Sequence, residues 1–426
     1  MAVDFSRLPK EIPVPEKGPK PLAWSLIFIT LAVLGIVISL WSWPRDSETR
    51  TAWFWVCVVV FPVCLSAVIV LRRFSHFHKR RNEALAFNAA IKGYHTAVFD
   101  AASIPLAVLA SAYLLDADET GNSFDAIRKR GDSPPTYQSR GSREMIVASH
   151  IEPDAAALSF DDQARQRAVL SWVLQSFLAR IHQPLAAVPE QVPVVVRLEV
   201  ESALDRSAVL EAWEELPASA RPARLTDQPL CEPSGGIDLV DTILDCRVPA
   251  VRDVVTVLIS VKLNNAREAD PDPGSWEAAC MMVFCPAHLA REYQLPVAGW
   301  FHRPQAESGA PPDEGALHHA LRWGRTDANS VGGVISAGLK GEAASRLRTG
   351  LRKAGRTGEA EVSPGFTLDA LADMPGPVAP WLASALALEQ ATLSGSPYIV
   401  GTQNNESVLL AVLAPVGHEA QRGIRE

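Results

Sequence analysis

The chain has 426 residues, more than one ordinary domain of about 100–200 residues needs, so we expect more than one structural part. Its formal net charge of −8 excludes a generally basic nucleic-acid-binding protein, and we expect no nucleic-acid partner. The six cysteines form no CxxC pair and no metal-finger spacing with histidine, so the sequence predicts no zinc site, no cofactor and a reducing compartment.

The N-terminal part of the chain has the pattern of a membrane hairpin. Residues 1–21 hold five prolines among mixed charges, which is typical of an extended tail. Residues 22–43 and 52–71 carry no charged side chain, and the first run reaches about 33 Å as a helix, enough for a hydrocarbon core of about 30 Å. No signal-peptide cleavage site follows the first run, so we predict two transmembrane helices. Pro62 lies within the second run, where we expect a kink that serves packing, with a hinge as the alternative.

Residues that favour membrane interfaces flank both runs. Tryptophan buries its ring and hydrates its N–H there, and the candidates are Trp24, Trp41, Trp43, Trp53 and Trp55. Basic residues mark the cytosolic side, and those after the second run are Arg72, Arg73, Lys79, Arg80 and Arg81. The N-terminal flank has four basic residues and the intervening turn only two. We therefore predict a multi-pass protein of the bacterial inner membrane, in contact with the lipid bilayer and with both termini in the cytosol.

The rest of the chain alternates between helical and strand patterns. Residues 72–100 predict a basic juxtamembrane helix, 104–115 a buried strand, 116–143 a loop and 161–183 an amphipathic helix. Further strands are predicted at 192–200, 254–263, 278–284, 297–301, 398–401 and 407–413, and helices at 207–216, 237–246, 286–292, 313–323, 344–354 and 376–391. This order predicts an α/β domain over 101–415 with a mostly parallel sheet and antiparallel edges, in halves of 101–290 and 295–415, before a tail at 416–426.

Motifs of known catalytic sites are missing from the sequence. There is no G-x-S-x-G elbow and no HExxH motif. The glycine-rich stretch 331–341 has the glycine spacing of a Walker loop, but Leu339 and Lys340 stand where that loop needs Lys and Ser or Thr. We expect a turn between elements here, with an anion-binding backbone nest as the alternative.

The element order after residue 104 resembles the thiolase-type fold, in which two similar α/β halves each end in antiparallel strands. Residues 376–391 (GPVAPWLASALALEQA), followed by PYIVGT and SVLLAVLAP, are similar to the buried helix and closing strands of β-ketoacyl synthases. In that family a cysteine at the start of a buried helix attacks a thioester with the help of two histidines. The resemblance puts Cys231 or Ser234 near the nucleophile's position, whereas neither histidine motif occurs.

A nucleophile without a base and oxyanion donors is not a catalytic site. We therefore expect a fold used without its chemistry, and a protein that is not an enzyme. The alternative hypothesis is a membrane-tethered acyl-transfer enzyme of thiolase type that uses Cys231 or Ser234.

A tryptophan-rich hairpin before such a domain also resembles accessory proteins encoded beside type VI secretion clusters in Proteobacteria. Our leading hypothesis is a non-catalytic inner-membrane protein whose cytosolic domain binds a protein partner, because a membrane anchor is joined to a large α/β domain without recognisable catalytic groups. The resemblance adds the role of a secretion accessory or adaptor. The sequence specifies neither the partner's identity nor an oligomeric state. A transporter or channel subunit is disfavoured, because neither apolar run contains a charge.

Overall fold

The computed structural model describes residues 7–44, 48–139, 144–222, 224–225, 228–231, 235–246, 253–268, 270–306, 315–339, 341–354, 363–371, 376–404 and 407–421. The chain divides into two compact units, Val3–Asp100 and Ala101–Glu426. Each unit is described by itself.

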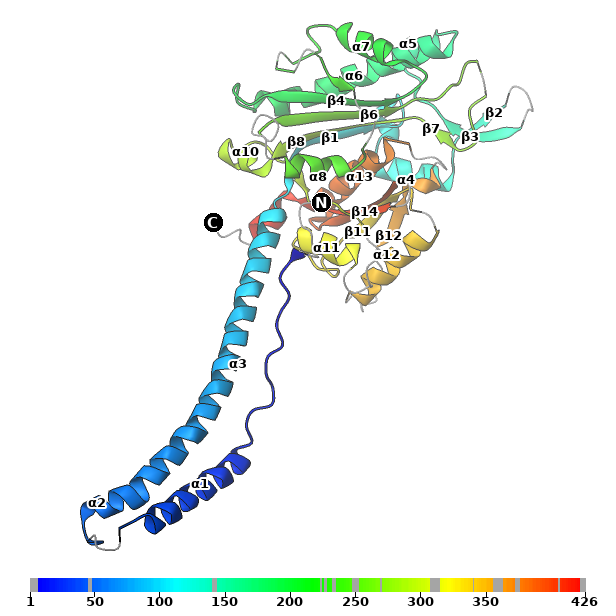
Figure 1. The fold of residues 1–426 in the computed structure, drawn as a ribbon. Coiled ribbons are helices and arrows are strands. Elements are labelled where there is room, and N and C mark those ends of the chain that lie inside the picture. Colours follow the sequence, from blue (N-terminus) through cyan, green and yellow to red (C-terminus); the bar gives the residue numbers. More distant parts are fainter. Residues whose placement is uncertain are drawn as a thin grey trace. The chain divides into compact units, whose positions relative to one another are not determined.

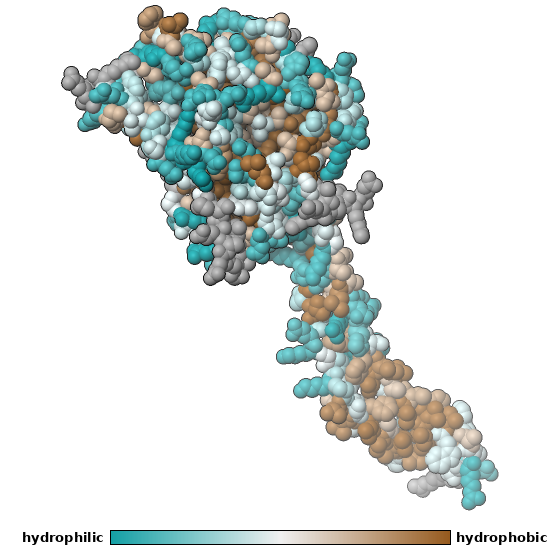
Figure 2. Space-filling model, turned by 180° about the vertical axis from the view of Figure 1, so that it is seen from behind, coloured by the Kyte–Doolittle hydropathy of each residue, from teal (hydrophilic) through white to brown (hydrophobic). Residues whose placement is uncertain are grey.

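The N-terminal unit is a helical hairpin (Figure 1). Helix α1 spans Pro21–Trp41, and a second, continuous helical segment consists of α2 (Ala52–Trp55), the π-helical turn η2 (Val56–Val60) and α3 (Phe61–Ala102). Both segments are long and apolar enough to cross a membrane. Figure 2 shows the hydrophobic residues gathered around the end of the hairpin that holds α1 and η2. Beyond residue 71 the second helix continues without a break to Ala102, and this part is the helix that was predicted over 72–100.

The two helices of the hairpin pack closely at a glycine and a proline. A Cβ at Gly35 would lie 2.6 Å from the Cβ of Pro62, so only glycine permits this approach. Pro62 has no N–H, and its ring would crowd the carbonyl four residues earlier in a regular α-helix. The π-helical turn η2 directly precedes it, with the Phe61 N–H donating to the Val56 carbonyl. Pro62 is buried in this contact, in agreement with the packing role that we expected.

The N-terminal tail is extended, as predicted, but it is not free. Residues 9–20, which we call the strap, lie along the part of α3 that follows the apolar run. The side chain of Asn88 on α3 pairs with both backbone groups of Ile12, each at 2.9 Å. A local sequence pattern gave no sign of this contact, because its partners are 76 residues apart.

The C-terminal unit contains two sets of strands with the same arrangement. The first set is β1 (Leu106–Leu114), β4 (Val194–Glu201), β5 (Leu230–Cys231), β6 (Val255–Lys262) and β8 (Ala278–Pro286); the second is β9 (Gly299–Phe301), β11 (Gly333–Ala337), β12 (Ser363–Thr367), β13 (Tyr398–Asn404) and β14 (Ser407–Pro415). In each set the spatial order is third, second, fourth, fifth, first, and the fifth strand is antiparallel to both neighbours. Pairing of β1 with β9 joins the sets into one eleven-stranded sheet of the described residues, with β10 (Gln305–Ala306) beside β14.

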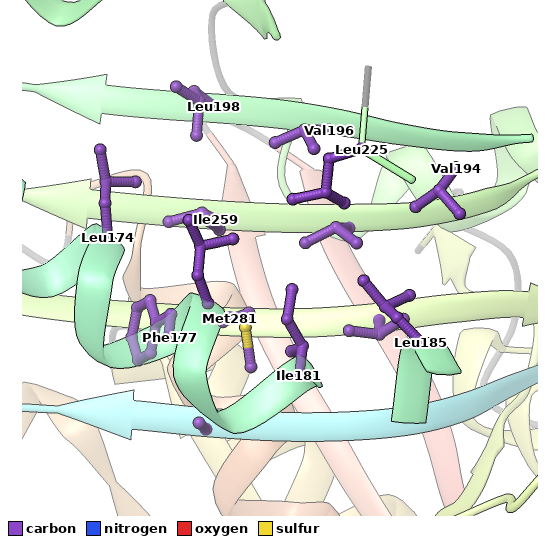
Figure 3. Packing of buried hydrophobic residues seen from close by; sticks show 14 of the residues in the cluster. Leu174, Phe177, Ile181, Leu185, Val194, Val196, Leu198, Leu225, Ile259 and Met281 are labelled. Atoms are coloured by element: carbon purple, nitrogen blue, oxygen red, sulfur yellow. The ribbon is translucent and has the colours of Figure 1, made fainter. Parts of the chain in front are cut away.

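Helices form three layers around these strands. Helices α6 (Asp162–Ala186), α7 (Arg206–Glu214) and α10 (Ala287–Glu292) cover the outer face of the first set. Figure 3 shows Leu174, Phe177 and Ile181 of α6 packed over the side chains of β4, β6 and β8. Helices α11 (Ala316–Trp323) and α12 (Gly341–Lys353) cover the outer face of the second set. Helices α8 (Asp238–Asp245) and α13 (Ala379–Ser394) share one buried cluster with strands of both sets, and we call this the central layer.

Four sequence predictions in this unit are wrong. The expected sheet was mostly parallel with antiparallel edges, but the antiparallel strands β8 and β14 lie inside the sheet, and the pairs at its two ends, β4 with β5 and β11 with β12, are parallel. The expected loop 116–143 contains η3 (Glu119–Gly121), α4 (Phe124–Asp132) and β2 (Thr136–Gln138), and β2 forms a small sheet with β3 (Met145–Ser149) and β7 (Ser275–Trp276). The expected glycine-rich turn contains β11, a strand paired on both sides. The expected tail begins with helix α14 (Val416–Gln421), where the His418 ring is buried and its Nε2 donates to the Gly324 carbonyl at 3.2 Å.

Candidate functional site

The starts of the two central helices meet, and this is where the thiolase resemblance expects a nucleophile. Helix α8 begins after Gly236, whose φ of 58° favours glycine. A Cβ there would lie 3.7 Å from the Cγ of Pro380, in the first turn of α13. The start of α8 therefore lies against the first turn of α13.

The predicted nucleophile Cys231 does not face this place. It lies on the edge strand β5 beside Leu198 and packs against the cluster under α6, on the outer face. Burial raises the pKa of its thiol, and the nearby Arg206 only partly opposes that effect. Because the reactive form of cysteine is the thiolate, Cys231 is poorly suited to attack a thioester. The other candidate, Ser234, lies outside the described residues.

Polar side chains that the sequence analysis missed form a row beneath α13. Glu199, Ser260, Cys280 and Tyr113 occupy paired positions on β4, β6, β8 and β1. Glu199 accepts a hydrogen bond from the indole Nε1 of Trp381 at 2.9 Å, and the Tyr113 hydroxyl donates to Glu389 at 2.5 Å. These two hydrogen bonds join the sheet to α13. The sequence gave little sign of the row, because Glu199 is one of three charged residues of β4, with Arg197 and Glu201.

Two side chains of this row, Cys280 and Tyr113, keep their protons at neutral pH. Burial raises the pKa of the Cys280 thiol well above its usual range, and the carboxylate of Glu199 raises it further. Burial likewise raises the pKa of Tyr113, with Glu389 adding to the effect. Both groups therefore stay protonated, and Glu199 and Tyr113 attach the sheet to α13 through their hydrogen bonds.

A second polar cluster is fully buried at the start of α6. Arg165 and Glu277 are both 0% exposed, and the guanidinium donates to both carboxylate oxygens. Arg165 also donates to the Asn264 carbonyl at 2.6 Å, while Glu277 accepts from the backbone N–H of Ile151 and of Asn264 at 2.9 and 2.8 Å. Burial lowers the pKa of Arg165, but the bonds to Glu277 outweigh that effect and raise it overall. Arg165 therefore keeps its positive charge.

Asp162 extends this cluster to the loop that precedes β7. Its carboxylate accepts from the backbone N–H groups of Ala266, Arg267 and Glu268 at 2.7, 2.8 and 3.0 Å. Burial raises the pKa of this carboxyl, but the three donors outweigh burial and lower it overall. The loop is thereby attached to the first turn of α6.

An exposed apolar turn stands directly before this anchored helix. Between α5 (Asp154–Ala157) and α6, Leu158 is 82% exposed and Phe160 is 97% exposed. The turn is held at both ends: the Ser159 N–H donates to the Ala156 carbonyl at 3.1 Å, and Asp161 caps α6 by accepting from the Ala164 N–H at 2.7 Å. We call Leu158 and Phe160 the apolar turn. The structure fixes its backbone while leaving its side chains in solvent.

The predicted interface residues lie on the surface of the hairpin. Trp41, Trp53 and Trp55 are 89%, 63% and 60% exposed, whereas Trp43 packs edge-on against Phe54 with ring centroids 5.0 Å apart. Trp24 is half-buried, and the basic residues of α3 are exposed: Arg72, Arg73, Lys79, Arg80 and Arg81. Among the residues that the structure describes, no group of three His, Cys, Asp or Glu side chains is arranged to hold a metal ion.

No protein-family model matches the chain, and no curated protein matches it. Several solved structures match it. The peroxisomal 3-ketoacyl-CoA thiolase of Saccharomyces cerevisiae, described as five-layered and constructed from two core domains of identical topology, is 11% identical with a TM-score of 0.43, over 74% of this chain and 98% of that one. The ishigamide ketosynthase/chain length factor is 14% identical with a TM-score of 0.44, over 74% and 100%. The oxazolomycin ketosynthase domain of Streptomyces albus JA3453 is 14% identical with a TM-score of 0.41, over 74% and 96%.

These neighbours contradict one expectation. Thiolases and ketosynthases are enzymes, so these neighbours contradict the prediction that the chain is not an enzyme. The predicted thiolase-type α/β fold with mixed sheets agrees with the strand order described above. With identities this low, the likeness concerns the fold alone and assigns no role to any residue of this chain.

Proposed function

We propose that this chain is an integral protein of the bacterial inner membrane whose cytosolic α/β domain binds a protein partner through the apolar turn. The proposal has two parts, the anchoring of the hairpin in lipid and the recruitment of a partner by Leu158 and Phe160.

Exposure of the apolar helices supports the membrane anchor. In the most apolar 18-residue stretch of Pro21–Trp41, only 6% is buried within the chain. In the corresponding stretch of Ala52–Ala102, 22% is buried. A core helix of a water-soluble protein buries its apolar side chains, whereas these are left for another apolar medium. A bilayer provides that medium for segments of this length.

Contacts of the strap support a topology with both flanks on one side. Pro9 and Ile12 precede the first apolar helix, and their partners His95 and Asn88 follow the second. Segments in direct contact must lie on the same side of a membrane, so the chain between them crosses an even number of times. The basic residues beside these segments favour the cytosolic side.

The observation that carries the recruiting function is the exposure of the apolar turn on a rigid support. Burying a Leu or Phe side chain is worth about 1.5–3 kcal/mol, and this gain is not realised for either residue within the chain. Exposed apolar side chains with fixed backbones are typical of partner-binding sites. The resemblance to type VI secretion accessory proteins makes a component of a secretion apparatus the class of partner that we propose.

Site-specific photo-crosslinking in native membranes tests this function. A photoreactive residue at Phe160 or Leu158 should yield the same discrete crosslinked protein, since both side chains belong to one surface. The matched control is Leu393, which is 74% exposed at the end of α13 and should give no such product. Crosslinks that are absent at the turn, or equal at all three positions, would refute the assignment of the surface.

The variant Phe160→Asp separates recruitment from folding. It should abolish co-purification of the crosslinked protein while leaving the melting temperature within about 1–2 °C, because a substitution at an exposed site changes stability by roughly 0.5 kcal/mol or less. If the protein still co-purifies with this variant, the apolar turn is not the partner-binding surface.

A further inference from the structure

The strap is held against α3 by contacts distributed along its length. Asn88 Oδ1 accepts from the Ile12 N–H and its Nδ2 donates to the Ile12 carbonyl, both at 2.9 Å, and Asn88 is only 8% exposed. The Nε2 of His95 donates to the Pro9 carbonyl at 3.0 Å. Lys92 and Glu11 form an ion pair at 3.8 Å, the weakest of these contacts because both side chains are exposed.

At its other end the strap meets an aromatic ring. A Cβ at Gly18 would lie 3.2 Å from the Cε1 of Phe77, so glycine lets the strap backbone lie close to this ring. The contacts therefore run in order, with rising strap numbers opposite falling helix numbers. The strap and α3 are antiparallel along the whole contact.

The lengths of the two segments match over this contact. From Pro9 to Gly18 an extended, proline-rich chain advances about 28 Å, at about 3.1 Å per residue. From His95 back to Phe77 an α-helix advances about 27 Å, at about 1.5 Å per residue. About two helical residues thus pair with each strap residue. The strap is therefore extended over the whole contact, with no loop between its two ends.

The composition of the strap reduces the conformational entropy that it loses when it binds to α3. Four prolines at positions 9, 13, 15 and 19 restrict φ, so little conformational entropy is lost on binding. Proline also lacks an N–H, which reduces the number of backbone donors that need a partner. Ile12 lies between these prolines and offers both a donor and an acceptor, which one Asn side chain satisfies together.

We propose that this face of α3 is a docking groove for the strap, and that the seated strap holds the α3 segment after residue 71 as a rigid stem. In proteins most of the stability of a helix comes from tertiary packing of one face. The strap supplies packing, because Ala84, Asn88 and Ile91 are buried on a stem whose other residues are mostly exposed. Release of the strap therefore exposes this face and loosens the stem. The inference does not depend on the partner proposed above.

Trypsin cleavage of the full-length protein in membranes tests the groove, because Lys17 lies within the strap and is followed by Gly18. Asn88→Ala should accelerate cleavage after Lys17 by about tenfold, since a factor of ten corresponds to about 1.4 kcal/mol, the order of one or two net hydrogen bonds. Asn82→Ala is the matched control, an exposed Asn on the same helix that should leave the rate unchanged.

A second pair of variants keeps the test independent of any damage to α3. Ile12→Pro removes the N–H that Asn88 accepts from and should accelerate cleavage by about tenfold, whereas Ile12→Ala retains that N–H and should change the rate less than about threefold. Deuterium uptake by residues 77–95 should rise with Asn88→Ala and Ile12→Pro alone. Cleavage of the unmodified protein as fast as that of both variants, or uptake by residues 9–20 equal to that of a free peptide of this sequence, would overturn the proposal.

Discussion

Replacement of Arg165 by methionine should be among the most damaging single changes in the α/β unit. The guanidinium is 0% exposed and donates to Glu277, also 0% exposed, and to the Asn264 carbonyl. Methionine fills much of the volume but leaves the Glu277 carboxylate with two backbone N–H donors and no opposite charge in bonding contact. Breaking a buried pair in this way costs about 3–5 kcal/mol.

That cost can be expressed as a melting temperature. Unfolding entropy is about 2.1 cal/mol/K per residue, so a unit the size of Ala101–Glu426 should melt about 4–7 °C lower. The assay is thermal unfolding of the detergent-solubilised full-length protein, followed by circular dichroism. Arg180→Met is the matched control, because Arg180 lies on the same helix and its ion pair with Glu119 is exposed.

The double variant Arg165→Met/Glu277→Leu distinguishes a charge effect from a packing effect. Removing both charges should recover most of the lost stability, because no ion is then left buried without its partner. If Arg165→Met melts within about 1 °C of the Arg180→Met control, the reasoning about the buried pair is refuted.

Two further predictions concern buried positions. Burial lowers the pKa of His302 to about 3 from 6.5, so the folded state excludes the proton and stability should fall as the pH drops below about 6.5; between pH 7 and 5 chemical denaturation should show a loss about 2 kcal/mol larger than in His302→Gln. Gly35→Leu should force α1 away from Pro62 and lower the melting temperature of the hairpin in detergent, whereas Gly93→Leu, with no atom within 4 Å of its added Cβ, should not. The first prediction is contradicted if the unmodified protein and His302→Gln lose the same stability between pH 7 and 5. The second is contradicted if Gly35→Leu and Gly93→Leu melt at the same temperature.

Local patterns predicted much of the fold, because they depend on neighbouring residues. The uncharged runs gave the membrane-length parts of both long helices, and β-branched stretches gave β4 and β6. Strand β11 was missed because it lies in the glycine-rich stretch 331–341, and glycine is depleted in strands. The structure supplies the reason for its glycines: a Cβ at Gly332 or Gly333 would lie 2.6 or 2.8 Å from the ring of Tyr398 on the adjacent strand.

The candidate site was harder to predict, because its contacts join distant parts of the chain. Arg165 and Glu277 are 112 residues apart, and periodicity carries no information about such a pair. The same holds for Glu199 and Trp381, which are 182 residues apart. Cys231 was selected by its position relative to a family, whereas the structure shows its side chain on the outer face. The apolar turn could have been noticed in the sequence as Leu158 and Phe160 between acidic and small residues.

Alkaline phosphatase fusions most directly test the central claim, that two helices cross the membrane and leave the strap, the stem and the α/β domain on the cytosolic side. The enzyme is active only outside the cytosol, so a fusion after Thr49 should be active and a fusion after Arg81 should be inactive. Activity after Arg81, or recovery of the full-length protein from the soluble fraction without detergent, would contradict the account.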